Sequence, residues 1–123
     1  MIRLLIAEDN QEMRRLLKSL VDGLVSVVCE CNDGAEALAA YYDHRPDFVL
    51  MDIEMKKMDG ITATRRIKAG DPAARIIIVT NYDEALLREA ALQAGACAFV
   101  AKKNLLELVR FLQEQSANAD QSP

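Results

Sequence analysis

The sequence predicts one α/β domain in which a parallel five-stranded sheet is covered by helices on both faces. Short apolar runs alternate with amphipathic stretches along the chain, and the apolar runs carry no polar side. Strands that are apolar on both faces are typical of a buried parallel sheet. The length of 123 residues fits a single domain, which we place at residues 1–115 and expect to be followed by a flexible tail or truncated linker at residues 116–123.

The first strand–helix–strand unit lies at the N-terminus. Residues 4–7 are apolar throughout and predict the first strand. Apolar residues then recur at helical spacing over residues 11–22, and Gly23 suits the end of that helix. The β-branched run at residues 25–31 predicts the second strand.

The middle of the chain repeats this alternation. Asp33 opens the next predicted helix, and Glu36, three positions later, completes a capping pair. That helix ends before Pro46. Residues 48–51 then predict the third strand, and a short helix is expected over residues 61–69.

The last part of the chain completes a (βα)5 pattern. Residues 76–79 form the most hydrophobic run and predict the fourth strand, which is followed by a helix over residues 83–94. Residues 98–101 predict the fifth strand, and an apolar stripe predicts a final helix over residues 105–115. Right-handed crossovers place all five strand carboxyl ends along one edge of the sheet. The common strand order for such a doubly wound, flavodoxin-like sheet is 2-1-3-4-5.

Composition argues against several functional classes. The net charge is −4, the pI is about 5.0 and the basic residues are scattered, so we expect no nucleic-acid binding by this domain. No apolar run approaches the ~20 residues that span a bilayer, so we expect no membrane partner. Cys29, Cys31 and Cys97 show no Cys-x-x-Cys spacing and His44 is the single histidine, which favours reduced thiols, no zinc site and a cytoplasmic location.

Polar residues directly follow four of the predicted strands: Glu8, Asp9, Asn10, Asp52, Thr80, Asn81, Lys102 and Lys103. Because strands 1 and 3 flank the expected ligand crevice, Glu8, Asp9 and Asp52 should converge there. Two carboxylates ~4 Å apart repel by about 4 kcal/mol at an effective dielectric of about 20, so three together would raise their own pKa values or attract a cation. A site made of oxygen ligands suits Mg²⁺ rather than zinc.

Ordinary structural roles also fit these residues one at a time. Asp9 could be a helix cap or a solvated loop residue, Lys102 a simple salt-bridge partner and Thr80 a strand-end hydroxyl. Their occurrence at the same edge, by independent spacings, favours a shared functional site.

Several motifs occur in order along residues 2–112: Glu8-Asp9-Asn10, Asp33 to Leu38, Val49 to Met55, Met58-Asp59-Gly60, Ile78-Val79-Thr80 and Gly95 to Lys102. Each is weak alone, but the ordered set closely resembles the receiver domain of bacterial response regulators. The segments at residues 80–84 and 99–104 look most like receivers joined to a LuxR-type helix-turn-helix.

This resemblance implies a role for each residue of the predicted site. Asp52 would be the phosphoacceptor, and Mg²⁺ would be held by Glu8, Asp9, Asp52 and the backbone carbonyl of Glu54. Lys102 would offset negative charge on the phosphoryl group. The remaining roles fall to four further residues: Thr80 as phosphoryl contact and switch, Phe99 as the switch aromatic or simple core, and Asn81 and Tyr82, together with Glu54, in access and rate tuning.

Partners follow from the same resemblance. A histidine kinase would supply the phosphoryl group, and phosphorylation could favour a homodimer. The output would be a DNA-binding transcription-regulator domain absent from this chain, and the domain itself would not be an enzyme beyond assisting its own phosphorylation and dephosphorylation at Asp52. A stand-alone receiver acting through protein–protein contacts, a Mg²⁺-dependent phosphohydrolase and a phosphorylation-independent interaction domain are the alternatives.

Three residues depart from the family pattern. Lys56 replaces a proline, which should remove a rigid turn from the loop after Asp52. Lys103 replaces the proline that often follows the strand-5 lysine, so we expect a trans Lys102–Lys103 peptide. Asn81 is bulkier than the residue usual at its position and should narrow access to the phosphoryl group. None of the three removes a reacting residue, so we expect them to change rates rather than chemistry.

Overall fold

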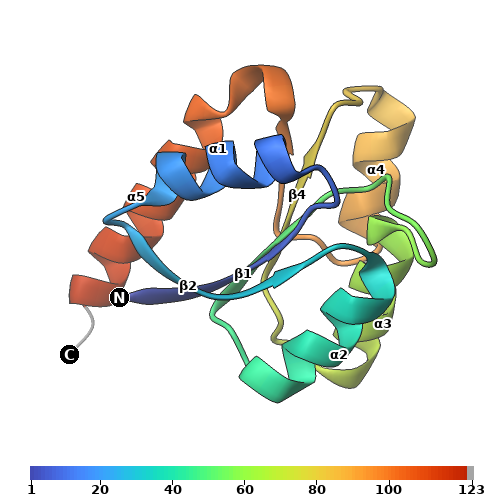
Figure 1. Cartoon of the computed structure of the whole chain (residues 1–123), viewed down its shortest axis with the longest axis horizontal. Helices are drawn as coiled ribbons and strands as arrows, with labels where there is room; N and C mark the ends of the chain where they lie inside the picture. The colour runs from blue at the N-terminus through green and yellow to red at the C-terminus, as the bar shows by residue number, and fades with distance from the viewer. Residues whose placement is uncertain (122–123) are drawn as a thin grey trace.

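The computed structural model describes residues 1–121, with side chains described through residue 118, and it has the predicted (βα)5 architecture (Figure 1). Five parallel strands form one sheet in the order β2-β1-β3-β4-β5. The strands are β1 (Ile2–Ala7), β2 (Val25–Cys31), β3 (Phe48–Met51), β4 (Ile76–Thr80) and β5 (Ala98–Ala101). Both the predicted strand positions and the predicted strand order are therefore confirmed.

Within the described residues, four α-helices connect the strands, and a short 3₁₀ helix and a fifth α-helix follow β5. They are α1 (Gln11–Val21), α2 (Gly34–His44), α3 (Gly60–Gly70), α4 (Ala85–Gln93), η1 (Lys102–Asn104) and α5 (Leu106–Gln121). The first three helices begin at side-chain caps, because Asn10, Asp33 and Asp59 each accept a hydrogen bond from a backbone N–H three residues later. Within the described residues, none of these helices is both long and apolar enough to cross a membrane.

Each face of the sheet packs against its own group of helices. One core lies under α2, α3 and α4 and includes Leu5, Met51 and Ile78. The other lies under α1 and α5 and includes Ile6 and Leu50. Since neighbouring residues of β1 and β3 enter opposite cores, these central strands are buried on both sides, as their uninterrupted apolar sequences predict.

The final helix is longer than predicted. Residues 116–121 continue α5 to Gln121, so the segment expected to be a flexible tail or truncated linker begins as helix. Alanines within this segment favour helix, and no Gly or Pro interrupts it before Pro123, so the helix packed on the sheet extends without a stop signal. The end of the predicted tail, residues 122–123, lies outside the described residues.

Strand register determines what meets at the carboxyl edge of the sheet. Ala7 of β1 pairs with both Cys31 of β2 and Met51 of β3. The residues that follow these three positions therefore leave the sheet side by side. Glu8 follows β1 and Asp52 follows β3, which brings the two carboxylates to one place from chain positions 44 residues apart.

Candidate functional site

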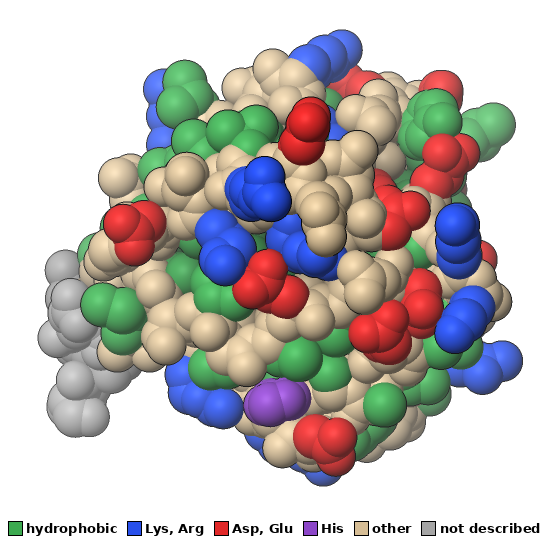
Figure 2. Space-filling view, in the orientation of Figure 1, with side chains coloured by type: hydrophobic (Ala, Val, Ile, Leu, Met, Phe, Trp, Pro, Cys, Tyr) green, Lys and Arg blue, Asp and Glu red, His purple; other side chains and the backbone are tan. Residues whose placement is uncertain are grey.

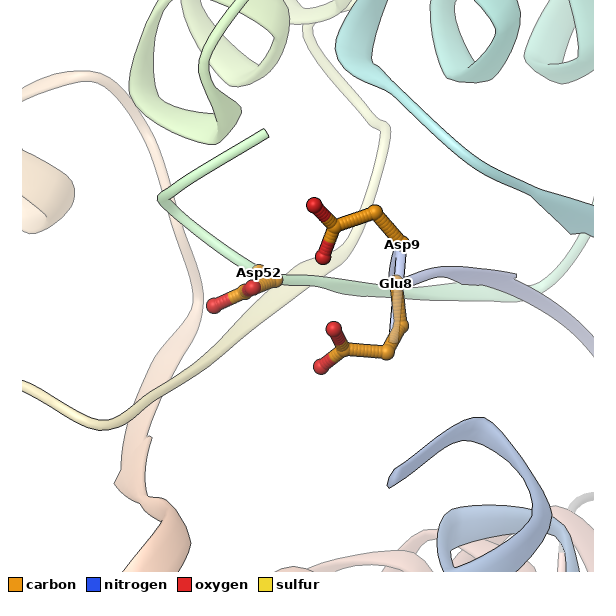
Figure 3. Close-up of side chains that lie close together, drawn as sticks. All are labelled: Glu8, Asp9 and Asp52. Atoms are coloured by element: carbon orange, nitrogen blue, oxygen red, sulfur yellow. The ribbon is translucent and has the colours of Figure 1, made fainter. Parts of the chain in front are cut away.

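Three carboxylates from two neighbouring strands form the centre of the site. Glu8, Asp9 and Asp52 each contribute a carboxylate oxygen, and these oxygens all lie within 4.8 Å of one another. Figure 3 shows the three side chains directed toward a common space beyond the ends of β1 and β3. Glu8 and Asp52 are buried, with 2% and 7% of their surface exposed, whereas Asp9 is exposed. The site therefore has two buried acidic groups and one that reaches solvent.

Backbone contacts fix the two loops that carry these carboxylates. The Glu8 N–H donates to the Cys31 carbonyl (3.0 Å), and the Asp52 N–H donates to the Ala7 carbonyl (3.0 Å). The start of α3 lies so close to the Asp52 carbonyl that a Cβ on Gly60 would collide with it. Gly60 is therefore required by this close approach of two backbones.

Burial makes the ionised form of Asp52 unfavourable. Removal from water, followed by repulsion from Glu8, raises the pKa of Asp52 from 3.8 to about 6. The Lys102 ammonium and a hydrogen bond from the Ile53 N–H to Asp52 Oδ1 (2.9 Å) act in the opposite direction but do not cancel the effect. Asp52 is thus a carboxylate held in a state that additional positive charge would stabilise.

Lys102 is the cation that faces this acidic pair. Its Nζ lies 2.6 Å from Glu8 Oε1 and 3.5 Å from Asp52 Oδ2, and only 6% of its side chain is exposed. It projects from η1, directly after β5, on the same edge of the sheet. Glu8 Oε1 is buried, and it has an ion pair with Lys102 but no aligned hydrogen bond.

Thr80, Asn81 and Tyr82 border the site from the end of β4. Thr80 is fully buried, and its Oγ1 accepts a hydrogen bond from the Tyr82 N–H (3.3 Å). Asn81 is exposed and lines a hollow together with Lys102. Hydrogen bonding to the Glu54 carboxylate, followed by the charge of that carboxylate, raises the pKa of Tyr82. Tyr82 and Glu54, from the loops that follow β4 and β3, therefore influence each other electrostatically.

Phe99 lies in β5 with 6% of its surface exposed and belongs to the core under α2, α3 and α4. The Arg88 guanidinium of α4 covers its ring, with Cζ 4.6 Å from the ring centroid. Asp83 holds Arg88 (3.0 Å) and also Lys103 (3.4 Å). In the structure Phe99 is thus a buried aromatic side chain beneath the Arg88 guanidinium.

Two arginine contacts near the site could not be predicted from the sequence. Arg88 covers Phe99, and Arg14 of α1 donates to the Glu8 carbonyl (3.0 Å) while its Nε faces Glu30 (3.3 Å). Helical periodicity places both arginines on polar positions, where a solvated side chain is the usual outcome. The one available signal was the position of Arg14 in the first turns after Asn10, close to the acidic residues.

The loop after Asp52 keeps a tight turn despite lacking proline. The Met58 N–H donates to the Lys56 carbonyl (2.7 Å), and Lys57 between them adopts φ +66°. A three-residue hydrogen-bonded turn is therefore present without the proline, and the effect of Lys56 on rates stays a prediction. The Lys102–Lys103 peptide is trans, as predicted, and the described residues contain no cis peptide bond.

This donor set fits a hard divalent cation. All the candidate ligand atoms are oxygens, two of the three carboxylates are buried, and an oxygen of Glu8 lacks an aligned donor. Mg²⁺ prefers such oxygen ligands, usually one or two carboxylates together with water and phosphate oxygens. The Glu54 carbonyl lies in the loop that borders the same space, since Asp9, Glu54 and Lys56 line one hollow.

Comparison with known proteins identifies the family. Residues 4–113 match the family described as the response regulator receiver domain. The chain belongs to this family. It is a CheY-like receiver domain of two-component signalling, and receiver domains as a class bind Mg²⁺ at an acidic site, interact with histidine kinases and are not themselves enzymes with turnover.

Similar sequences include both single-domain and longer proteins. The receiver is 44% identical over 101 residues to the chemotaxis protein CheY of Bacillus subtilis, covering 81% of this chain and 84% of that protein. It is 40% identical over 103 residues to a protein-glutamate methylesterase/protein-glutamine glutaminase of Haloarcula marismortui, covering 82% of this chain and 28% of that protein. The same domain thus matches nearly all of one relative and a minor part of another.

Solved structures show the same fold. A LuxR-family two-component response regulator from Aurantimonas has a TM-score of 0.89 and 32% identity, covering 96% of this chain and 86% of that one. The CheX-CheY-BeF3-Mg²⁺ complex from Borrelia burgdorferi has a TM-score of 0.79 and 29% identity, covering 86% of this chain and 84% of that one. The likeness to LuxR-family receivers agrees with the resemblance seen in the sequence.

Proposed function

We propose that this receiver accepts a phosphoryl group from a histidine kinase onto Asp52, with Mg²⁺, and thereby switches an output. One observation carries the proposal. Asp52 is buried with Glu8 in a pocket that Asp9 borders, its pKa is raised to about 6, and Lys102 reaches both buried carboxylates. A pocket with excess negative charge would repel a phosphoryl group unless positive charge were also present. Lys102 and a bound Mg²⁺ would supply that positive charge.

The carboxylate of Asp52 would act as the nucleophile. Its Oδ1 accepts the Ile53 N–H, whereas Oδ2 faces the Lys102 ammonium at 3.5 Å. Attack on the phosphorus of phosphohistidine would form an acyl phosphate on Asp52 and release the kinase imidazole. The Lys102 ammonium would then lie next to the new phosphoryl oxygens and offset their charge.

Glu8, Asp9, Asp52 and the Glu54 carbonyl would hold Mg²⁺ in this pocket. When bound, the ion supplies positive charge that offsets the carboxylates and the incoming phosphoryl oxygens. Lys102 would keep Glu8 and Asp52 correctly placed from the side of β5, and Arg14 would hold the Glu8 backbone from the side of α1.

Thr80 and Phe99 would transmit the change. The Thr80 hydroxyl lies at the end of β4, where its O–H would donate to a phosphoryl oxygen while its oxygen can still accept the Tyr82 N–H. Phe99 of β5 pairs with Ile78 of β4, and its ring lies beneath Arg88 of α4. Movement at the end of β4 would therefore shift Phe99 and change the surface of α4. Asn81 and the Tyr82–Glu54 pair would control access and hence rates.

We propose a DNA-binding transcription-regulator domain as the output. Its support is the likeness to a LuxR-family regulator across 96% of this chain. A stand-alone receiver acting by protein–protein contact is the second candidate, favoured by the 44% identity to CheY over most of that protein. Acidic and basic side chains are interspersed on the face in Figure 2, so that face has no basic stripe for nucleic acid, and phosphorylation-linked homodimerisation is compatible with either output.

Labelling by a small phosphodonor tests the phosphorylation proposal. Acetyl phosphate should label the receiver once, at Asp52, in a Mg²⁺-dependent manner, and Asp52→Asn should abolish the label. The matched control is Asp43→Asn, which changes an exposed aspartate near the end of α2 and should leave labelling intact. Label that persists in Asp52→Asn would exclude Asp52 as the phosphoacceptor, and steady turnover of phosphate esters would instead favour the phosphohydrolase alternative.

A further inference from the structure

Two cysteines of β2 lie with their sulfur atoms close together. Cys29 Sγ and Cys31 Sγ are 3.8 Å apart, Cys31 is 2% exposed and Cys29 is partly buried. Alternate residues of a strand share one face of the sheet, which is why the two thiols meet across Glu30. Both belong to the core under α2, α3 and α4, and neither contributes a side chain to the acidic site.

A bulge in β2 determines which face of the sheet the two cysteines occupy. Leu4 pairs with Val27 and Leu5 with Cys29, so Val28 is an extra residue without a partner in β1. Val25 and Val27 consequently pack under α1 and α5, whereas the cysteines face the opposite core. β2 is also an edge strand that pairs only with β1, so its backbone can deform without breaking a second ladder.

We propose that Cys29 and Cys31 form a reversible intramolecular disulfide, which makes the receiver a redox-responsive module. Two residues of strand span roughly 6.4–6.8 Å between Cα atoms, at the upper end of the range that a disulfide accepts. A bond formed across this spacing is strained, and strained disulfides are the ones that small thiols reduce readily. The pair is therefore suited to cycle rather than to serve as a permanent crosslink.

The oxidant would be a low-molecular-weight disulfide. The Cys29 thiolate attacks one sulfur of that disulfide, forms a mixed disulfide and releases one small thiolate. Cys31 then loses its proton and attacks the Cys29 sulfur, which closes the internal disulfide and releases the second small thiolate. Two electrons pass from the protein to the small disulfide, which ends as two thiols.

Burial assigns the order of these two steps. Cys31 is 2% exposed, so an oxidant in solvent has little access to its sulfur. Cys29 is the more accessible sulfur and becomes the first to react. Cys31, 3.8 Å away, is then placed to attack the mixed disulfide from within the core.

Oxidation would reach the acidic site through one hydrogen bond. The Cys31 carbonyl accepts the Glu8 N–H at 3.0 Å, so a change in the backbone at Cys31 moves the residue that begins the carboxylate cluster. This consequence rests on the proposed function, whereas formation of the disulfide does not. Losing one such hydrogen bond should weaken Mg²⁺ binding by roughly two- to tenfold.

Mass spectrometry of the Cys97→Ser receiver tests the proposal, because Cys97 is exposed and would add an unrelated adduct. After incubation with oxidised glutathione, the folded protein should lose two hydrogen atoms, carry no glutathione and regain both thiols in dithiothreitol. The matched control is Cys29→Ser with Cys97→Ser, which retains Cys31 alone and should not lose the two hydrogens.

The outcomes separate the two parts of the proposal. The disulfide proposal would be overturned by a stable glutathione adduct on Cys29. Two free thiols after prolonged incubation with oxidised glutathione would also overturn it. If the disulfide forms but titration with Mg²⁺ gives the same affinity before and after oxidation, the coupling to the site is overturned. Absence of Mg²⁺ binding in both forms would instead count against the proposed function and leave the disulfide standing.

Discussion

The two edges of the sheet treat the same residue type in opposite ways. At the amino edge, Asp71 accepts the Tyr41 hydroxyl (2.6 Å) and the Ala73 N–H (3.1 Å) and lies 3.4 Å from Arg45. These contacts, led by the Tyr41 hydrogen bond, lower the pKa of Asp71. At the carboxyl edge, burial and Glu8 raise the pKa of Asp52 to about 6.

This contrast separates Asp71, which stabilises the fold, from Asp52, whose surroundings suit a reactive carboxylate. The ionised form of Asp71 is favoured by its neighbours, so the interaction stabilises the folded state. The ionised form of Asp52 is disfavoured, so ionised Asp52 lowers the free energy of unfolding, and a bound cation would reverse this effect.

The largest expected effect is on the phosphorylation rate when Lys102, the ammonium beside Asp52, is removed. Lys102→Ala should slow labelling of Asp52 by acetyl phosphate by about 100- to 1,000-fold, because it removes the ammonium that faces the reacting group. Lys103→Ala is the matched control, since Lys103 is exposed and contacts Asp83 instead. Initial rates at saturating Mg²⁺ measure both, and equal rates for the two variants would remove Lys102 from the chemistry.

The two aspartates should respond oppositely to loss of charge. At pH 7 without Mg²⁺, Asp52→Asn should raise the free energy of unfolding by about 1–2 kcal/mol, because it removes a buried carboxylate whose ionisation is disfavoured. Asp71→Asn should lower the melting temperature, because the Tyr41 and Arg45 contacts weaken. Urea and thermal unfolding measure these changes, and a shift of the same sign in both variants would break the comparison.

The gain from Asp52→Asn should depend on pH. The unfolded carboxyl has its ordinary pKa of 3.8, and the folded carboxyl has a pKa of about 6. The folded state thus binds the proton more tightly, so the wild type is not penalised below pH ~4, loses stability relative to Asp52→Asn between pH ~4 and ~6, and bears the full penalty above that range. A difference between the two proteins that is constant from pH 4 to pH 7 would show that Asp52 titrates normally.

The smallest effect is expected where the site meets solvent. Tyr82→Phe removes the hydroxyl that interacts with Glu54 and should change the labelling rate by no more than about threefold, since interactions of exposed polar groups are weak. The control is Tyr42→Phe, which removes a hydrogen bond to the Ile67 carbonyl far from the carboxylates and should leave the rate unchanged. A change of tenfold or more in Tyr82→Phe would make this pair a gate rather than a modest tuner.

The sequence predicted the strands and the converging carboxylates because both follow from short-range patterns. An apolar run such as Ile76–Thr80 predicts a buried strand, and the parallel topology then brings Glu8 and Asp52 to one edge. The bulge at Val28 and the cover of Arg88 over Phe99 depend instead on tertiary packing.

The helix end was also beyond prediction from pattern alone. Residues 116–121 carry no apolar stripe, which favours a loop, yet they extend a helix already nucleated on the sheet, where each added residue needs no new nucleus. The raised pKa of Asp52 likewise required coordinates, because it depends on burial and on the distance to Glu8. What the pattern could supply was which groups meet, but not how strongly they interact.

The most direct measurement is the free energy of unfolding at pH 7 as Mg²⁺ is added, for the wild type and for Asp9→Asn. A site that binds the folded state alone should raise wild-type stability by RT ln(1 + [Mg²⁺]/Kd), and Asp9→Asn should need a much higher concentration for the same gain. If both proteins show the same response, or the wild type shows none, Glu8, Asp9 and Asp52 do not form the cation site on which the proposed phosphorylation depends.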